Sequence, residues 1–527
     1  LSYGEFTPYL GLAPGIYDLA VRPAGNPAVV ATFRADLSVL AGTSAYVFAS
    51  GLLNGDPSFG LYAALPNGWV VALPATPTAR VQIIHNSPEP TVDIWAGEQR
   101  LVDDFAFRTA TPFVSVPADR LIDVGIALDN STAASQSIAV FPATFESGKT
   151  YIVTASGIVG DANAPFNLII NDAGREIAAD TNLVDVAVLH GSPDAPAVDV
   201  DAFGVGNIIN SLAYGVFTPY LSLTPGIYDL AVRPAGNPSV LATFRADLNG
   251  LAGASAYVFA SGLLQGTPGF GLFAALADGT VIELPLTPTA RVQIIHNSPS
   301  PTVDVWAGQQ RLIDDFAFRT ATPFISVPAD REINVGVALS TSMMASEAIA
   351  NFPVNFESGK TYIVTASGVV GNPGAPFTLI VNDAAREAAN DPNLIDVAVL
   401  HGSPDAPAVD VDAVFVGNVL SDLAYSEFTP YLSLAPGIYD LAIRPAGNPD
   451  VVATFRADLS GLGGAAAYVF ASGFLQGSPS FGLYAALPNG TVVALPLTPK
   501  ARVQLIHKTP SPMEEVWAGQ KRQVDDF

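Results

Sequence analysis

The sequence lacks cysteine and carries little charge, and both shortages limit what the protein can be. With no cysteine among its 527 residues, disulfide bonds are excluded. Only 13% of the residues are charged, and 23 Lys and Arg stand against 48 Asp and Glu, which gives a net charge of −25. A nucleic-acid-binding surface needs clustered basic residues to neutralise phosphates. We therefore expect no nucleic-acid partner.

Long uninterrupted apolar runs are also missing, although the chain is apolar as a whole. Hydrophobic residues make up 49% of it, and the mean hydropathy is +0.36. Uncharged stretches such as residues 57–79 are broken by Pro, Asn and Gly, whereas a membrane helix needs roughly 20 mostly apolar residues. We expect no membrane-spanning segment. The apolar residues should lie in strands buried on both faces, or at contacts between domains and chains.

All histidines of the chain occur in one repeated motif. The stretch VQIIHNSPEPTVDIW (residues 81–95) returns at residues 292–306 and 503–517, and a related stretch, VAVLHGSPDAPAVDV, occupies residues 186–200 and 397–411. Successive copies lie 105 or 106 residues apart, and copies of the same type lie 211 apart. This period is that of a small domain, so the sequence predicts a tandem array of two alternating types. We name the first type A and the second type B. The five repeat markers are His85, His190, His296, His401 and His507.

The sequence of each repeat predicts a β-sandwich. Short β-branched and aromatic runs are separated by Pro and Gly about every 8 to 12 residues, which is typical of this fold. Asn67-Gly68, Asp278-Gly279 and Asn489-Gly490 recur in the last hairpin and suit a two-residue type I′ turn. We therefore expect an all-β chain, a tandem array of immunoglobulin-like antiparallel β-sandwich domains.

The repeats divide the chain into six segments. Joints of the LPLTPTAR kind lead from type B to type A, and their prolines favour a stiff, extended path and hence a rod or filament. The expected segments are B0 (1–74, a type B sandwich without its first strands), A1 (79–174), B1 (183–285), A2 (290–385), B2 (394–496) and the tail (500–527, the first strands of a type A sandwich).

Three stretches carry a resemblance to a known family. HGSPDAPAVDV, LAYGVFTPYLSLTPGIYDLAVRPAGNP and FESGKTYIVTASG are similar to the bacterial extracellular repeats catalogued as domain of unknown function 4397. The resemblance covers essentially the whole chain, although the A units depart from it at SPEPTVDIW. It implies a β-sandwich, secretion and tandem use on cell surfaces, and it brings no catalytic residues.

The histidine motif can be interpreted as catalytic, metal-binding or structural. A carboxylate follows each histidine eight or nine residues later, at Asp93, Asp199, Asp304, Asp410 and Glu515. The only hydroxyl in the motif precedes a proline, where a turn cap is expected rather than a nucleophile. One histidine with one or two carboxylates also falls short of the four ligands of structural zinc. We expect no enzyme and no cofactor, and interpret the histidines as buried markers whose ring nitrogens satisfy backbone groups.

Calcium is a separate alternative. Asp199 and Asp201, and likewise Asp410 and Asp412, offer oxygen ligands of the kind that calcium takes, but no calcium-loop spacing is present. Residues two apart in a strand face the same side, which is also the pattern of a solvated strand face.

The two ends of the sequence complement one another. B0 begins at Leu1, at a position equivalent to Leu212, and the tail stops at Phe527, which falls at the same position of the repeat when FAFRTATPF (from Phe105) is laid on LAYGVFTPY (from Leu212). The tail therefore supplies what B0 lacks with almost no gap or overlap. Either the tail of one molecule completes B0 of the next by strand addition, which gives a head-to-tail filament, or the joint is covalent in a longer array. Lys508, Glu514 and Lys521 depart from the sister copies, which suits a specialised donor. The expected assembly residues are Leu1, Tyr3, Phe6, Val503, Leu505, His507, Val516, Trp517 and Phe527.

These observations favour a structural protein located outside the cell or on its surface. The leading hypothesis is a subunit of an extracellular bacterial filament or surface fibre whose partner is another copy of itself. The alternative is an adhesin or a stalk that binds cell-surface or matrix polysaccharide, with Trp95, Trp306 and Trp517 as stacking platforms. These tryptophans lie in alternating strands, where packing in a core is the commoner role.

Overall fold

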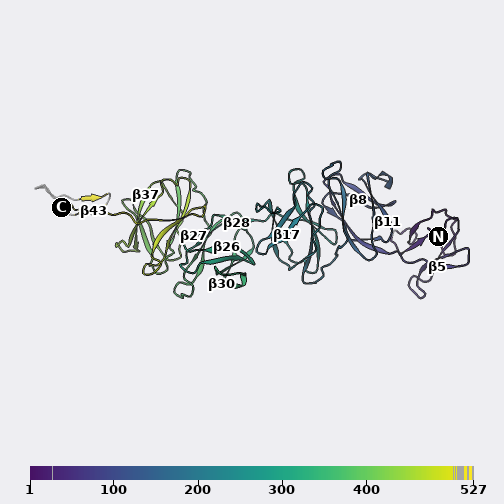
Figure 1. Cartoon of the computed structure of the whole chain (residues 1–527), viewed down its shortest axis with the longest axis horizontal. Coiled ribbons are helices and arrows are strands. Elements are labelled where there is room, and N and C mark those ends of the chain that lie inside the picture. Colours follow the sequence, from purple (N-terminus) through teal and green to yellow (C-terminus); the bar gives the residue numbers. More distant parts are fainter. Residues whose placement is uncertain (27, 502–503, 505, 507–515, 519–520, 525–527) are drawn as a thin grey trace. The chain divides into compact units, whose positions relative to one another are not determined.

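The chain is all-β, as the sequence predicts. The computed structural model describes residues 1–26, 28–501, 504, 506, 516–518 and 521–524 (Figure 1). Among these residues the only helices are two single 3-10 turns, Ala134–Gln136 and Ala345–Glu347. No helix in the described ranges has the length and hydropathy to span a bilayer. The chain divides into two compact units, one of residues 1–201 and 207–286, the other of residues 202–206 and 287–527.

A1, in the first unit, is a sandwich of two sheets. One sheet has the order β10-β6-β13-β14, with β9 also paired to β6, and the other has the order β12-β11-β7-β8. The first strand, β6, runs parallel to β13, while its neighbours are antiparallel; the sequence did not predict this parallel pair. The strands are β6 (Thr78–Asn86), β7 (Val92–Ala96), β8 (Gln99–Phe105), β9 (Thr109–Ala110), β10 (Val114–Pro117), β11 (Leu121–Leu128), β12 (Ala139–Thr144), β13 (Thr150–Ser156) and β14 (Asn167–Asn171).

B1 repeats this topology with the same number of strands, but it has an additional last strand, β23, beside β22 and no counterpart of the short strand β9. Its sheets have the orders β18-β15-β21-β22-β23 and β17-β16-β19-β20, and the first strand is again parallel to the strand beside it, β21. The strands are β15 (Val184–Leu189), β16 (Val198–Ala202), β17 (Gly206–Leu212), β18 (Leu221–Leu223), β19 (Ile227–Pro234), β20 (Ala242–Asp247), β21 (Ser255–Ser261), β22 (Gly271–Leu276) and β23 (Val281–Glu283).

The second unit contains A2 and B2, whose sheets repeat those of A1 and B1. The A2 strands are β24 (Thr289–His296), β25 (Val303–Ala307), β26 (Gln310–Phe316), β27 (Thr320–Ala321), β28 (Ile325–Pro328), β29 (Glu332–Leu339), β30 (Ala348–Asn355), β31 (Thr361–Ser367) and β32 (Thr378–Asn382). The B2 strands are β33 (Ile395–Leu400), β34 (Val409–Ala413), β35 (Gly417–Leu423), β36 (Leu432–Leu434), β37 (Ile438–Pro445), β38 (Ala453–Asp458), β39 (Ala466–Ser472), β40 (Gly482–Ala486) and β41 (Val492–Ala494).

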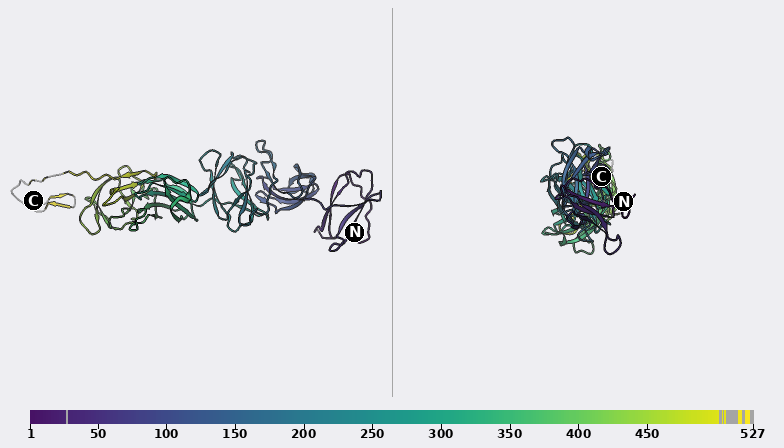
Figure 2. Two further views of the ribbon diagram at one scale, coloured as in Figure 1. Left: turned by 60° about the horizontal axis from the view of Figure 1, so that its bottom comes forward. Right: turned by 90° about the vertical axis from the view of Figure 1, so that its right-hand side faces the viewer.

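B0 contains only the later strands of a type B sandwich, drawn in purple in Figure 2. A two-stranded sheet pairs β1 with β2, and a three-stranded sheet has the order β3-β4-β5. The strands are β1 (Ile16–Val21), β2 (Ala31–Asp36), β3 (Tyr46–Ser50), β4 (Gly60–Ala64) and β5 (Val70–Ala72).

The described part of the tail forms a hairpin of β42 (Val516–Ala518) and β43 (Lys521–Val524). Ala518 pairs with Lys521 and Trp517 with Arg522, as Ala307 pairs with Gln310 in β25 and β26 of A2. The hairpin therefore has the register of the second and third strands of a type A sandwich.

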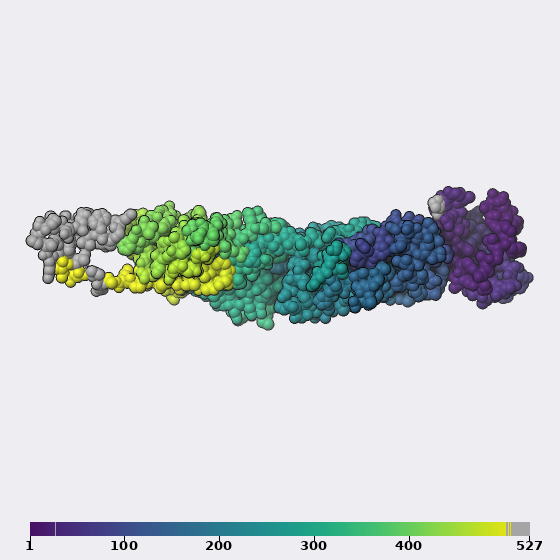
Figure 3. All heavy atoms as spheres, turned by 90° about the horizontal axis from the view of Figure 1, so that it is seen from above, coloured from purple at the N-terminus to yellow at the C-terminus, as the bar shows by residue number. Residues whose placement is uncertain are grey.

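Central strands are buried on both faces, which explains the high apolar content. Every residue of β21 is buried. Val258 on this strand faces the inside of B1, where Val184 and Val186 of β15 pack with it, whereas Tyr257 faces outward. On the outer face, Tyr257 packs in one cluster with Ile84 of A1. A1 and B1 thus share an apolar contact, and in Figure 3 their blue and teal atoms meet without a gap.

The last hairpin differs from the sequence prediction in its turn. Gly279 has φ of +90°, but Asp278 is not among the residues with positive φ, so the turn is not type I′. The amide of Gly279 donates to the carbonyl of Leu276, and Leu276 bonds back to Thr280. The loop is therefore a three-residue hairpin loop, in which only the last residue needs the left-handed conformation that glycine accepts.

Candidate functional site: the open edges of the first sandwich

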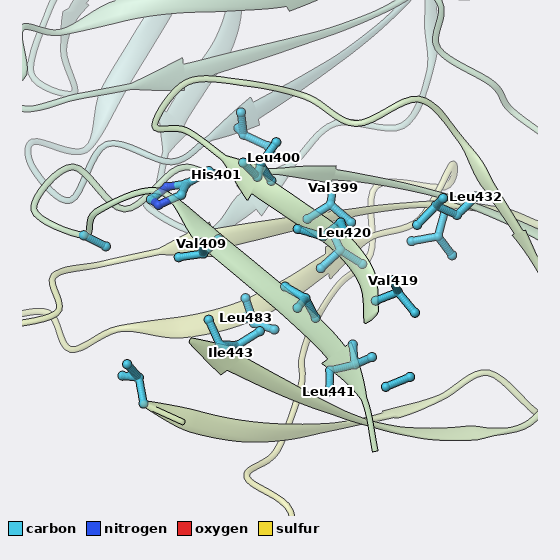
Figure 4. A pocket seen from close by; sticks show the side chains of 18 of the residues that line it. Val399, Leu400, His401, Val409, Val419, Leu420, Leu432, Leu441, Ile443 and Leu483 are labelled. Atoms are coloured by element: carbon cyan, nitrogen blue, oxygen red, sulfur yellow. The ribbon is translucent and has the colours of Figure 1, made fainter. Parts of the chain in front are cut away.

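A complete type B sandwich is closed by side chains from both its early and its late strands. An apolar cavity of about 150 Å³ lies inside B2 (Figure 4). Val399 of β33 and Val409 of β34 line it from the first two strands. Leu441 of β37 and Leu483 of β40 line it from the later strands. The core of B2 thus needs both halves of the domain.

B0 has only one of these halves. The late residues of the B2 core have counterparts two repeats earlier, with Leu19 in place of Leu441 and Leu61 in place of Leu483. Val399 has no counterpart in residues 1–74, because its strand precedes the position at which B0 begins. The described residues of B0 therefore contribute to its core only the side chains of the later strands.

Two sheet edges of B0 have no neighbouring strand among the described residues, although the equivalent edges of B2 are paired. In B2, β37 pairs with both β38 and β34, and β39 pairs with both β40 and β33. In the described residues of B0, β1 pairs only with β2, and β3 only with β4. Residues 10–12 form no strand, although their counterparts in B1, Leu221–Leu223, pair with the first strand. An unpaired edge offers free N–H and C=O groups to an incoming strand.

Side-chain exposure shows where the missing strands would lie. Val47, on the inner face of β3, is 44% exposed, whereas its counterparts Val258 and Val469 are 9% and 8% exposed. Leu1 is 83% exposed and its counterpart Leu212 only 6%. The same residue types in the same repeat are thus covered in complete sandwiches and open in B0.

A second exposed surface of B0 is aromatic. Tyr46 faces outward and stacks with Phe48, which stacks with Tyr62. The counterpart of Tyr46 in B1 is Tyr257, which packs in one cluster with Ile84 of A1 and with Ala187 of its own first strand. The aromatic face of B0 therefore corresponds to a surface that A1 and the first strand cover together in B1.

Arg22 is a charged residue that directly follows β1, at the open edge of this strand. Its counterpart in B1, Arg233, lies at the end of β19 and contacts both acidic residues of β16. Nη1 donates to Asp199 at 2.8 Å, and Nε donates to Asp201 at 2.6 Å. Arg22 is exposed, and within the described residues it makes no hydrogen bond or ion pair. Arg22 therefore has no carboxylate partner among the described residues, whereas Arg233 and Arg444 each bind two aspartates of the neighbouring strand.

The calcium alternative concerned these same aspartates. Oδ1 of Asp199 accepts from the amide of Ser211 at 2.8 Å, and Oδ2 accepts from the amide of Gly236 at 3.0 Å as well as from Arg233. The amides of Ser211 and Gly236, followed by the Arg233 charge, lower the pKa of Asp199. Asp410 and Asp412 hold Arg444 in the same way in B2. A calcium ion would have to displace a guanidinium at either place.

A different acidic group occurs in the A sandwiches. Carboxylate oxygens of Asp93, Asp103 and Asp104 converge, as do those of Asp304, Asp314 and Asp315. Arg100 lies among the first three and contacts Asp93 at 3.4 Å and Asp103 at 2.6 Å. The charges of this group are thus partly balanced within the domain.

The histidines sit where the first strand ends. His85 is buried, its Nε2 donates to the carbonyl of Pro90 at 3.1 Å, and its Nδ1 accepts from the amide of Ser87. His190 makes the corresponding Nε2 contact with Pro196 at 2.9 Å. The contacts of His296 and His401 are with Pro301 and Pro407. Burial lowers the pKa of each, in His296 to about 4, so these rings are neutral and hold the turn.

Two of the three tryptophans proposed as sugar-stacking platforms, Trp95 and Trp306, are largely buried, and the side chain of Trp517 lies outside the described part of the structure. Nε1 of Trp95 donates to the Ser131 hydroxyl at 2.9 Å, and Nε1 of Trp306 donates to Ser342 at 3.1 Å. Both rings are 6% exposed. They anchor the second strand of their sandwich and offer no open ring face.

The expected assembly residues fall into three groups. Leu1, Tyr3 and Phe6 are exposed in B0. Val516 and Trp517 lie in β42, the hairpin strand of the tail. The remaining members lie outside the described residues, namely Val503, Leu505, His507 and Phe527, and so does the last repeat marker, His507. Sequence reasoning missed Arg22, whose signal was its recurrence as Arg233 and Arg444 opposite the DVDA aspartates.

Comparison with known proteins gives a family. A search of curated proteins found no match. Among solved structures, the TIE protein of Bacillus anthracis is 10% identical, with 80% of this chain and 74% of that one covered, and a TM-score of 0.12. That TM-score is too low to indicate a shared arrangement of domains. The model of one family, described as Domain of unknown function (DUF4397), matches four times in tandem, at residues 79–187, 184–275, 290–395 and 395–514. These matches cover well over half of the chain, which therefore belongs to the DUF4397 family.

Proposed function

We propose that this protein is a structural subunit of an extracellular bacterial filament or surface fibre, in which the tail of one copy completes B0 of the next. The observation that carries the proposal is the open edge of B0. Val47 is exposed there, while Val258 and Val469 at the same repeat position are buried by first strands. The tail has the sequence of such first strands, and its hairpin has their register.

The complete sandwiches define how the tail would pair. In B2, Val399 of the first strand lies opposite Val469 in a parallel pair, and Val411 of the second lies opposite Ile443 in an antiparallel pair. The repeat spacing places Leu505 at the first of these positions, beside Val47, and Val516 at the second, beside Val21. Strand addition of this kind combines backbone hydrogen bonds with side chains that fill a core.

Burial of the exposed apolar side chains of B0 would lower the free energy on association. Burying an exposed Val or Leu side chain contributes about 1.5–3 kcal/mol, and B0 exposes several. The two surfaces differ, so the contact is heterologous and propagates from copy to copy unless it closes into a ring. The completed domain would be a hybrid, with type A first strands on a type B remainder.

Other features support an extracellular structural role without specifying it. The chain is a tandem array of one domain family, is strongly acidic and has no cysteine. Its buried histidines and paired aspartates are engaged in holding turns and strands. We accordingly propose a non-enzymatic protein whose partner is itself. The polysaccharide-binding alternative gains no support, because Trp95 and Trp306 are buried.

Electron microscopy of the purified chain tests the proposal, with a variant that lacks residues 501–527 as its partner sample. We expect polymers whose subunits follow one another at a constant axial repeat, and monomers from the shortened variant. Single particles from both samples would contradict the proposal. A single longer polypeptide containing both the tail and B0 sequences, found by mass spectrometry of the native material, would instead show that the hybrid sandwich is covalent, within a longer array.

A further inference from the structure

We infer that Arg22 fixes the register of the incoming strand by forming an ion pair with Glu515 of a second copy. The inference rests on the proposed function and names the residues that give its contact specificity. Its site consists of Arg22, the open edge of β1 and the backbone amide of Gly25, all in the described part of B0.

The two complete type B sandwiches show what the site binds. In B1, Arg233 holds Asp199 and Asp201 of the neighbouring strand, and the amide of Gly236 donates to Asp199 at 3.0 Å. In B2, Arg444 and Gly447 contact Asp410 with distances of 2.9 Å and 3.0 Å. Arg22 and Gly25 occupy these positions in B0. The site is thus built to receive a carboxylate from a strand that pairs with β1.

The tail supplies a carboxylate at the matching position. In B2, Asp410 lies opposite Arg444 and directly precedes Val411, which lies opposite Ile443. In the tail, the corresponding residue before Val516 is Glu515. With Val516 opposite Val21, Glu515 comes opposite Arg22. Strand pairing that buries the tail therefore also brings the two charges together.

A type A strand in a type B remainder changes the partners of this carboxylate. In A2, Oδ2 of Asp304 accepts from the Ser342 hydroxyl at 2.6 Å and from Arg311 at 3.2 Å. Ser342 comes from the loop after β29, and B0 has Gly25 and its neighbours in the equivalent loop. The Glu515 carboxylate would therefore exchange a serine hydroxyl for Arg22 and the amide of Gly25. Trp517 occupies the position of Asp201 in B1, so in this register Glu515 is the carboxylate opposite Arg22, while the adjacent Glu514 faces the other side.

The ion pair and the core together discriminate between registers, because successive side chains of a strand point to opposite faces. A slip by one residue would place either Val516 or Glu514 opposite Arg22. The first slip leaves Arg22 without a carboxylate, and the second carries Val516 out of its core position beside Val21. Charged hydrogen-bonded pairs of this kind contribute specificity and partner choice. The correct register satisfies both the core and the charge.

Charge reversal tests the inference on the full-length chain. Arg22→Glu and Glu515→Arg should each raise the concentration needed for polymerisation by about 10- to 100-fold, because each places like charges opposite one another. The double variant should recover most of the assembly. Lys360→Glu is the matched control for Arg22→Glu, since it makes the same change in net charge at a half-buried side chain of A2 whose ion pair with Glu357 lies away from B0 and the tail, and it should polymerise normally.

Engineered cysteines test the register itself against a cysteine-free background. Arg22→Cys with Glu515→Cys should give intermolecular disulfide ladders, because opposite residues of antiparallel strands are about 4.5–5.5 Å apart. Arg22→Cys with Val516→Cys should cross-link poorly, since these side chains face opposite sides. Normal polymers of Arg22→Glu, or equal cross-linking of both pairs, would overturn the inference and leave the proposed function standing. Absence of polymers from the unmodified chain would overturn both.

Discussion

Asn86 of A1 donates from Nδ2 to the carbonyl of Gly191 at the start of B1, over 3.0 Å, and shares the same amide with the carbonyl of Ala260 at 3.1 Å. Asn86 is buried, so the bond lies within the contact between two sandwiches of the first unit. A side chain at Gly191 would meet this amide, because a Cβ there would lie 2.3 Å from Nδ2. A1 and B1 are thus held together by the hydrogen bonds of Asn86 as well as by the apolar cluster between them.

Replacing this asparagine should loosen the contact. Asn86→Ala removes a donor from two buried carbonyl groups, and leaving such groups unpaired costs about 1–3 kcal/mol. We expect faster amide hydrogen exchange in β6 and β21, measured peptide by peptide. Asn297→Ala is the matched control, because Asn297 makes the same two contacts in the second unit. It should affect β24 and β39 only, and unchanged exchange in both variants would contradict the structural role.

The open core of B0 predicts unequal effects of one substitution at two equivalent places. Val258→Ala should destabilise B1 by about 1–3 kcal/mol, because it leaves a cavity in a closed core. Val47→Ala should change the stability of the unassembled chain by less than about 0.5 kcal/mol, because Val47 is exposed there. Hydrogen exchange of B1 and B0 peptides measures both. Equal losses at the two sites would show that the B0 core is already closed.

The buried histidines predict a loss of stability in mild acid. The pKa of His296 falls from 6.5 in the unfolded chain to about 4 in the fold, since burial disfavours the charged ring. Protons then bind the unfolded state better, so the contribution is present above pH 6.5 and is lost as the pH falls from 6.5 toward 4. For a shift of this size the loss is on the order of 3 kcal/mol.

Melting temperatures measured between pH 7 and pH 4.5 test this dependence. His296→Gln should flatten the A2 part of the profile, because glutamine can donate to the carbonyl of Pro301 and does not titrate. Arg233 lowers the pKa of Asp201 below 3.8, so the loss of such ion pairs begins at more acidic pH. A melting temperature that stays constant across the window would refute the assignment of neutral buried rings.

Tryptophan exposure distinguishes the two functions that the sequence suggested. Trp69, on the last hairpin of B0, is 70% exposed, while Trp95 and Trp306 are buried. In a Trp517→Phe background, iodide should quench about a third of the emission, and Trp69→Phe should remove that quenchable part. Quenching of the remaining two tryptophans would restore the case for polysaccharide stacking.

Much of the fold could be predicted because its signals are local. Pro and Gly mark the turns, alternation marks the strands, and the histidine motif marks the start of each sandwich, since its ring bonds to a carbonyl only five or six residues away. The hairpin at Gly279 was placed correctly but given the wrong turn type. The extra loop residue depends on which strand residues pair across it, Leu276 with Thr280, and composition alone does not specify that choice.

The candidate site was only half predictable. The mismatch between B0 and the tail is visible in the repeat, but Arg22 looks like any surface arginine until Arg233 is seen bonded to Asp199, 34 residues away in sequence. Pairs this distant depend on which strands are neighbours, and strand order is a property of the folded sheets.

The sequence by itself determined the repeat, the all-β fold and the two domain types, because these follow from spacing and from the alternation of side chains along single strands. Only the tertiary structure decided that the first strand of a sandwich runs parallel to a late strand, and that Ile84 and Tyr257 pack in one cluster between two domains. It also placed Arg22 at the end of an edge strand, β1, that has no neighbour on one side among the described residues. Contacts between residues far apart in sequence depend on how whole sheets pair and pack, and no local pattern records them.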